Sequence, residues 1–285
     1  MFKIINRKYF YFIMVLVAAG SITSCQPDEI GSGNGLADPE VDATFTVTPV
    51  DGEPNNFTLQ AATENVISSM WNVGDGFYKG NMTEDLFLPD AGTYTITHTA
   101  IGRGGETNTA SQEVVVAQSD PVAGNLVKGG KFENDDKNQW TVLNISDSGT
   151  FWTFNEGSAT VIGGDNNQQG IYQAIEVEAN KEYTIDMKVW GSGVTETWFE
   201  VYASTTPPVQ YSDYSADGRR MGLNTWAGCG SDAFEGKLSV IGCVGSGNKV
   251  TFDQSGTIYL VIKSGGKSLG STGISITNVE MRGSK

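Results

Sequence analysis

The chain has 285 residues, a formal net charge of −15 at pH 7 and 36 glycines. This acidity is unsuited to the phosphate backbone of nucleic acids, and it disfavours anionic membranes and acidic polysaccharides. We therefore expect a neutral partner.

The first residues resemble an export signal in their composition. Three basic residues, Lys3, Arg7 and Lys8, precede an apolar run that covers residues 9–19. A basic region, a short apolar region and small residues before a cleavage point are typical of a secretory signal peptide. The apolar run is shorter than the roughly 20 residues that a membrane-spanning helix needs. We predict that residues 1–24 are a signal peptide.

Small residues lead into a cysteine in the sequence I-T-S-C, which ends at Cys25. This pattern resembles a bacterial lipobox, which implies cleavage before Cys25, lipidation of Cys25 and attachment to a membrane through several acyl chains. The alternative is an ordinary signal with a cysteine at that point by chance. The acidic stretch Q-P-D-E at 26–29 resembles the export signal of Bacteroidota lipoproteins that are displayed on the outer face of the outer membrane; a solvated tether is the alternative. With G-S-G-N-G at 31–35, residues 25–40 are predicted to form a flexible tether.

A first domain is predicted over residues 41–118. Alternating residues at 44–48, 93–99 and 113–116 indicate strands. W-N-V-G-D-G at 71–76 and A-G-T-Y-T-I-T at 91–97 resemble the two motifs of polycystic-kidney-disease-type (PKD) domains, which implies an immunoglobulin-like sandwich that acts as a spacer. His98, the single histidine, alternates with threonines, and we expect it to be an outward or half-buried strand residue.

A second domain is predicted over residues 122–285. Its motifs are N-L-V-K-G-G-K-F-E at 125–133, Trp140, G-I-Y-Q at 170–173, K-E-Y-T-I-D-M-K-V at 181–189 and I-S-I-T-N-V-E-M at 274–281. Their order and spacing resemble carbohydrate-binding modules of families 4, 9 and 22, which implies a β-sandwich jelly roll. Recurring β-formers, many glycines and no long helical periodicity independently predict an all-β protein.

The family often holds a structural calcium ion near the first strand, for which Glu133 is a candidate ligand. Thr277 stands where the family has an aspartate, so one carboxylate ligand is missing. No other cofactor is expected.

Alternation along three strands predicts which residues of this domain point away from the core. The outward set forms one predicted face of aromatic and polar side chains: Trp190, Trp198, Tyr202 and Tyr259 with Asp186, Lys188, Glu200 and Lys263. Exposed aromatics rimmed by polar groups mark binding sites, and a pyranose ring offers both a C–H patch and hydroxyls. The alternative is that some of these aromatics fill the second sheet or lie under a loop.

The segment from 205 to 247 is a second candidate for the site, because long segments between strands are usually functional or disordered. It carries Asn224 and Trp226, and we favour Trp226 as a sugar platform. Cys229 and Cys243 lie in the same segment and are expected to pair in an oxidising compartment, two free thiols being the alternative. Trp152, in T-F-W-T-F, is a third candidate.

Together these features predict a surface lipoprotein that binds a neutral polysaccharide. The resemblance implies β-1,3-glucan (laminarin) or mixed-linkage β-glucan as ligand, and an outer-membrane glycan transporter with its lid lipoprotein as partners. An adhesin or structural surface protein that recognises protein ligands is the first alternative, and a glycoside hydrolase is the second. We do not expect an enzyme, because the chain has no H-E-x-x-H, no G-x-S-x-G and no ordered pair of carboxylates of the glycosidase type.

The lipid anchor is testable through Cys25. The substitution Cys25→Ala is expected to release the mature protein from the membrane fraction, because it removes the thiol that the acyl chains modify. Fractionation of cells followed by detection of the protein measures this. If the variant still sediments with the outer membrane, the lipoprotein interpretation is wrong.

Overall fold

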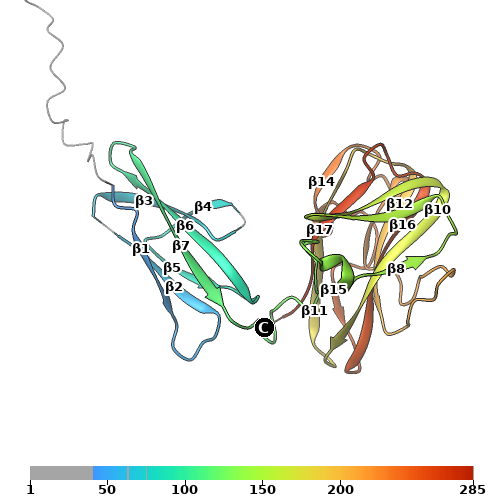
Figure 1. The fold of residues 1–285 in the computed structure, drawn as a ribbon, viewed down its shortest axis with the longest axis horizontal. Helices are drawn as coiled ribbons and strands as arrows, with labels where there is room; N and C mark the ends of the chain where they lie inside the picture. Colours follow the sequence, from blue (N-terminus) through green and yellow to red (C-terminus); the bar gives the residue numbers. More distant parts are fainter. Residues whose placement is uncertain (1–40, 63, 75, 285) are drawn as a thin grey trace, which may run out of the picture. The chain divides into compact units, whose positions relative to one another are not determined.

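The computed structural model describes residues 41–284 apart from positions 63 and 75, and it separates into two compact units (Figure 1). The predicted signal peptide, tether and lipidation site at Cys25 lie outside the described residues. Unit 1 consists of residues 41–49, Phe57–Leu86 and Tyr94–Val114, and unit 2 of Val50–Asn56, Phe87–Thr93 and residues 115–284. Both units are built from β-strands, so the predicted all-β class with two β-sandwiches in series is confirmed.

The first unit packs a three-stranded sheet against a four-stranded one. The three-stranded sheet has the order β1 (Phe45–Pro49), β2 (Asn56–Ala61), β5 (Thr83–Phe87). The four-stranded sheet has the order β4 (Phe77–Gly80), β3 (Val66–Asn72), β6 (Gly92–Gly102), β7 (Thr107–Val116). Phe45 and Trp71 meet edge to face between the sheets with ring centroids 5.2 Å apart, the arrangement that aromatic rings favour.

His98 differs from its prediction, because it is fully buried. Its ring stacks on Trp71 with centroids 4.3 Å apart. Nδ1 lies 2.8 Å from the carbonyl oxygen of Ala43, and Nε2 lies 2.9 Å from the hydroxyl of Ser69. Both ring nitrogens therefore have partners, which is what allows a polar ring to occupy a core position. The alternation of His98 with threonines led to the prediction that it points outward or is half-buried, whereas it points into the core.

The second unit is a sandwich of two larger antiparallel sheets, each named here after one of its tryptophans. The Trp198 sheet has the order β13 (Met221–Asn224), β12 (Thr195–Ser204), β16 (Gly256–Ser268), β10 (Ser158–Val177), β8 (Thr141–Asn144). The Trp190 sheet has the order β9 (Thr150–Asn155), β10, β17 (Ile274–Gly283), β11 (Glu182–Gly191), β14 (Phe234–Lys237), and β15 (Lys249–Thr251) also pairs with β11. The short helices are η1 (Asp136–Gln139), η2 (Thr225–Ala227) and α2 (Leu238–Ile241). In the described part of the chain, no helix is both long and apolar enough to span a bilayer.

Strand β10 belongs to both sheets of the sandwich. Residues 158–163 pair with β9 in the Trp190 sheet, whereas residues 164–177 pair with β16 in the Trp198 sheet. The strand bends between these halves, where the register against β16 shifts between Gly164 and Asn167. Gly163 has a φ of +118°, and a Cβ there would lie 1.9 Å from the carbonyl oxygen of Gly149. Glycine is therefore required at the bend.

The core of the sandwich follows the strand alternation that the sequence predicted. The inward residues of β11, β12 and β16 are all buried: Tyr183, Ile185, Met187 and Val189; Phe199, Val201 and Ala203; Ile258, Leu260 and Ile262. They form one cluster with Trp140, which stacks on Phe132 with ring centroids 5.5 Å apart.

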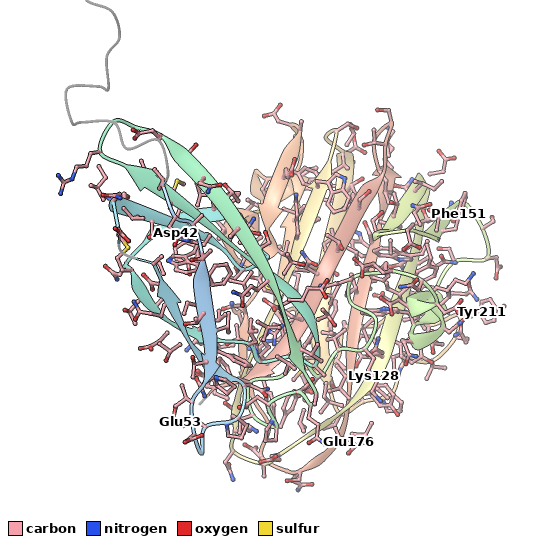
Figure 2. The ribbon with its side chains drawn as sticks, turned by 60° about the vertical axis from the view of Figure 1, so that its left-hand side comes forward. Asp42, Glu53, Lys128, Phe151, Glu176 and Tyr211 are labelled. Atoms are coloured by element: carbon pink, nitrogen blue, oxygen red, sulfur yellow. A yellow bond between two sulfur atoms is a disulfide. The ribbon has the colours of Figure 1, made fainter. Side chains whose placement is uncertain are left out.

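Trp140 provides a test of this core. Trp140→Ala is expected to lower the free energy of unfolding by about 3–5 kcal/mol, because it leaves a cavity where a large buried ring packs. Tyr211→Ala is the matched control, since Tyr211 is 67% exposed and projects from the edge of the unit (Figure 2). Denaturant unfolding of both variants measures the difference. Equal stability of the two variants would contradict the placement of Trp140 in the core.

Candidate functional site

The single aromatic face predicted from sequence does not exist, because its members are divided between the two sheets. Trp190, Asp186 and Lys188 lie on β11 in the Trp190 sheet. The others lie on β12 and β16 in the Trp198 sheet: Trp198, Glu200, Tyr202, Tyr259 and Lys263. The outer faces of two packed sheets point in opposite directions. The outward direction was predicted correctly for each strand, but not the sheet to which each strand belongs.

Residues 205–220, called the strap here, fold back over part of the outer face of the Trp198 sheet. Tyr214 of the strap meets Tyr202 edge to face with centroids 5.7 Å apart, and both belong to a small buried cluster with Leu143 and Val261. Tyr202 and Glu200 are consequently buried. Their prediction as ligand-binding residues is therefore wrong, because the strap covers the strand face that alternation assigned to solvent.

A charge network holds the strap against the sheet. Lys263 on β16 is 3% exposed, and its Nζ lies 2.5 Å from Oδ1 of Asp213 in the strap and 3.6 Å from Oε2 of Glu200. Arg219 of the strap also pairs with Glu200. Tyr202 donates a hydrogen bond of 2.7 Å to Glu200. Burial of the phenol, with the hydrogen bond to Glu200, raises the pKa of Tyr202, so it remains a protonated donor.

The indole of Trp198 lies across β16, above a glycine. A Cβ on Gly265 would come within 3.0 Å of Cζ2 of Trp198 and within 2.5 Å of Cβ of Gln168. A glycine inside a strand often marks such a close approach. The Nζ of Lys263 lies 4.7 Å from the centre of the Trp198 ring, a cation–π contact that helps to hold the indole in place. Trp198 is half-buried, so part of its ring remains available to a ligand.

Trp226 lies beside this position and is 66% exposed. Its backbone N–H donates to Oδ1 of Asn224, which caps η2. Asn224 is the cross-strand partner of Trp198, and Thr225 bonds through Oγ1 to the backbone N–H of Thr197. Asn224 thus positions Trp226 next to β12. The structure therefore brings Trp198, Asn224 and Trp226 together, as three of the predicted ligand-binding residues.

The predicted disulfide is present and anchors the same segment. Cys229 and Cys243 are joined, with Cα atoms 6.1 Å apart. The backbone N–H of Asn224 also contacts Sγ of Cys229 at 3.3 Å. In the chain-entropy model, a cross-link that closes a loop of this size contributes about 3 kcal/mol. The disulfide and the cap by Asn224 therefore restrain the backbone that carries the exposed indole of Trp226.

Trp152 is not available to a ligand, so its prediction as a third platform is wrong. It is 6% exposed and packs in the core against Phe199, with ring centroids 6.4 Å apart. Its Nε1 donates to the carbonyl oxygen of Gln169. In the T-F-W-T-F sequence of β9, alternation turns Trp152 inward and leaves Phe151 outside.

Tyr259 lies on the same face as Trp198 but far from it. It pairs with Ser204, whereas Trp198 pairs with Gly265, six residues further along β16. Six residues of extended strand span about 20 Å. Tyr259 is half-buried beside Tyr172, with centroids 6.2 Å apart. It is therefore outside the cluster formed by Trp198, Asn224 and Trp226.

The residues near Glu133 do not fit a calcium site. Glu133 is exposed, and Thr277 donates its hydroxyl to the carbonyl oxygen of Lys131. Among the residues that the structure describes, no three histidine, cysteine, aspartate or glutamate side chains gather as a metal site. Calcium requires six to eight oxygens, several of them anionic.

Two residues of the site were not identified from the sequence. Gly265 provides the space for the indole of Trp198. Gln168 lies on the opposite side of Gly265, and the Oε1 atom of Gln168 is buried without a hydrogen-bond partner. The S-G-G-K sequence at 264–267 was the available signal, because two glycines within a strand pattern indicate that another group approaches the backbone closely.

No family model and no curated protein sequence matches the chain. Solved structures with a similar arrangement include a carbohydrate-binding module from the β-sandwich superfamily, with 14% identity, 84% of this chain and 97% of that chain covered, and a TM-score of 0.30. Another is the tandem CBM22-1–CBM22-2 domain of Paenibacillus barcinonensis Xyn10C, with 10% identity, 84% and 77% covered, and a TM-score of 0.35. A CBM4 structure has 16% identity, 55% and 99% covered, and a TM-score of 0.34. These likenesses are too distant to carry a functional argument, which rests instead on the site itself.

Lys263→Met tests the charge network. The variant is expected to lose about 2–3 kcal/mol of stability, because Glu200 loses one of two cations and Asp213 loses its partner. Lys267→Met is the matched control on the same strand: its Nζ is exposed, lies 3.9 Å from Glu196, and should matter by less than about 0.5 kcal/mol. Urea unfolding measures both. Similar stability of the two variants would show that Lys263 does not hold the strap.

Proposed function

We propose that this protein binds neutral polysaccharide at the surface formed by Trp198, Trp226, Asn224 and Gln168. The observation that carries the proposal is the half-exposed indole of Trp198, which lies over Gly265 and is fixed by Lys263. An indole held against a sheet presents an apolar plane that the axial C–H patch of a pyranose can cover. Because the ring is already fixed, less side-chain conformational entropy is lost when the ligand binds.

The residues around this plane suit the hydroxyls of a sugar. Asn224 and Gln168 lie on opposite sides of Trp198. Oδ1 of Asn224 is engaged by the backbone N–H of Trp226, which leaves its Nδ2 as a donor for a sugar hydroxyl. Trp226 supplies a second exposed indole on the segment that the disulfide braces. An aromatic surface with a few placed polar groups is the usual composition of a small-ligand site.

The ligand class we propose is β-1,3-glucan, such as laminarin, or mixed-linkage β-glucan. The acidic charge of the chain supports an uncharged polymer over an acidic one. The family resemblance of the motifs in residues 122–285 supports a glucan.

We further propose that the protein is lipid-anchored through Cys25, exposed on the outer membrane, and passes its ligand to an outer-membrane transporter and its lid lipoprotein. The lipobox-like sequence and the acidic stretch after it support this location. Unit 1 would then act as a spacer between membrane and glycan.

A hydrolase is disfavoured by the arrangement of the carboxylates near the site. Glu200 is held by Lys263, Arg219 and Tyr202. Its oxygens are therefore committed to structural partners, whereas glycoside hydrolysis needs one carboxyl group free to donate a proton and a second one free to act on the sugar or on water.

An adhesin is the second candidate, and one observation in unit 1 favours it. Phe77 and Tyr78 are 52% and 41% exposed on β4, which is an edge strand of its sheet. Edge strands can pair with another chain, and exposed aromatics are enriched in protein interfaces. Electrophoresis in native gels cast with a neutral β-glucan separates the candidates. Retardation without loss of the glucan supports the binder, and release of reducing sugar supports a hydrolase. If neither is observed, the adhesin is supported.

The site is tested most simply through its two indoles. Trp226→Ala is expected to lower the affinity for β-1,3-glucan at least 30-fold, which corresponds to about 2 kcal/mol, and Trp198→Ala is expected to lower it measurably. Tyr211→Ala, which removes an aromatic ring of similar exposure from the strap, is expected to change nothing. Calorimetric titration measures affinity, and thermal melts report folding. If both tryptophan variants fold and bind like the parent, the proposed site is wrong.

A further inference from the structure

The disulfide between Cys229 and Cys243 touches the backbone of Asn224 with both of its sulfur atoms. The backbone N–H of Asn224 lies 3.3 Å from Sγ of Cys229, and the carbonyl oxygen of Asn224 lies 3.7 Å from Sγ of Cys243. The N–H of Cys229 also donates to that carbonyl oxygen, at 3.2 Å. Because Asn224 caps η2 and accepts from the N–H of Trp226, the disulfide contacts the residue that sets the position of Trp226.

The other end of the bridge is anchored to the Trp190 sheet. Cys243 lies two residues after α2, in which Ser239 donates from its N–H and its hydroxyl to the carboxylate of Asp186, at 3.1 and 2.6 Å. Asp186 lies on β11 and is 7% exposed, so this buried carboxylate holds α2 in place. Residues 224–230, called the Trp226 segment here, are attached to the Trp198 sheet through Asn224. The disulfide therefore ties the Trp226 segment to the second sheet as well.

Glycine is frequent on both sides of the bridge. The disulfide joins G-C-G at 228–230 to G-C-V-G-S-G at 242–247. Gly228 and Gly230 have φ of +92° and +90°, which glycine adopts without strain. Glycine also has more conformational freedom to lose than other residues when a segment becomes ordered. A cross-link between two glycine-rich stretches therefore contributes to their order in the folded protein.

The disulfide is open to thiol exchange from solvent, because Cys243 is exposed and Cys229 is half-buried. A small thiolate can attack Sγ of Cys243 and form a mixed disulfide, while the sulfur of Cys229 leaves as a thiolate and takes up a proton. A second thiolate then attacks the external sulfur and releases Cys243 as a thiol. In sum, the protein disulfide and two small thiols give two cysteine thiols and one external disulfide.

The sandwich keeps its main anchors when the bridge is cut. Strand β13 stays paired with β12, and α2 stays bonded to Asp186. The N–H of Cys243 donates to the carbonyl oxygen of Gly222 at 3.0 Å, and this bond does not need the disulfide. Reduction is therefore expected to loosen the Trp226 segment without unfolding the unit.

We infer that the disulfide between Cys229 and Cys243 is a redox-sensitive switch of the glycan site. In the oxidised form it holds the Trp226 segment in position for binding, and reduction by a small thiol releases the segment and weakens binding. This inference rests on the proposed function for its ligand. A disulfide that served stability alone would act mainly on the unfolded chain and would leave the affinity of the folded protein unchanged. Affinity therefore separates a switch from a purely structural cross-link.

The first test is calorimetric titration of the mature protein with a linear β-1,3-glucan hexasaccharide, before and after reduction with dithiothreitol. Reduction is expected to lower the affinity about tenfold at a temperature at which both forms are folded. The double variant Cys229→Ala with Cys243→Ala is the matched control. It is expected to bind as weakly as the reduced protein and to be insensitive to dithiothreitol.

The second test needs no glycan. Reduction is expected to speed hydrogen exchange of the N–H groups of Trp226 and Cys229 about tenfold, because both donate to Asn224 in the Trp226 segment. The N–H groups of β12 that pair with β16 are the internal control and are expected to exchange at an unchanged rate. Amide exchange followed by NMR measures both sets.

The outcomes separate the switch from the proposed function. Equal affinity of the oxidised and reduced forms overturns the switch and leaves the proposed site. Unfolding on reduction also overturns it, because the sandwich would then depend on the bridge. No binding of the hexasaccharide by the oxidised protein overturns the proposed function, and the exchange measurement then decides whether the disulfide holds the Trp226 segment. If the double variant fails to fold, the reduced parent decides alone.

Discussion

The bend in β10 is the constraint on which the second unit depends. Because the strand turns at Gly163, the first part of β10 lies in the Trp190 sheet and the second part lies in the Trp198 sheet. The two sheets are therefore joined covalently at that point and face each other across a single core. Trp190 and Trp198 lie on strands of different sheets, so residues that alternate identically in sequence reach opposite surfaces of this unit. A side chain at Gly163 would clash with the carbonyl of Gly149, so the bend requires glycine at this one position.

The burial of Lys263 shapes the outer face of the Trp198 sheet. Burying Lys263 costs desolvation energy, which the structure offsets with Glu200 and Asp213. The ion pair with Asp213 holds the strap over part of the face, and the same ammonium group makes a cation–π contact with Trp198. Trp198 stays half-buried beside the segment that carries Trp226, and this is where we propose the ligand site. Lys263 therefore contributes both to the packing of the strap and to the position of Trp198 in the proposed site.

The sequence predicted periodic features well and contacts between distant segments poorly. Alternation identified the inward residues of β11, β12 and β16 because a strand fixes side-chain direction with period two. It could not assign those strands to sheets, since strand order depends on the bend in β10 and on long-range pairing. It also could not foresee that Tyr202 and Glu200 would be covered, because their burial comes from a strap that folds back from residues 205–220. His98 was misjudged for a related reason: its partners, Ala43 and Ser69, come from other strands. Trp226 could be singled out because it lies close in sequence to the cysteine pair, which the structure joins in a disulfide. The role of Asn224 and Trp226 in ligand binding stays a prediction.

In the function proposed above, the indole of Trp198, held over Gly265, is the glycan platform. A crystal structure of the protein with a β-1,3-glucan oligosaccharide bound tests it most directly. We expect a pyranose ring stacked on the face of Trp198 that points away from β16, with one of its hydroxyls bonded to Nδ2 of Asn224. Sugar bound in the crystal without any contact to Trp198 or Trp226 would contradict it.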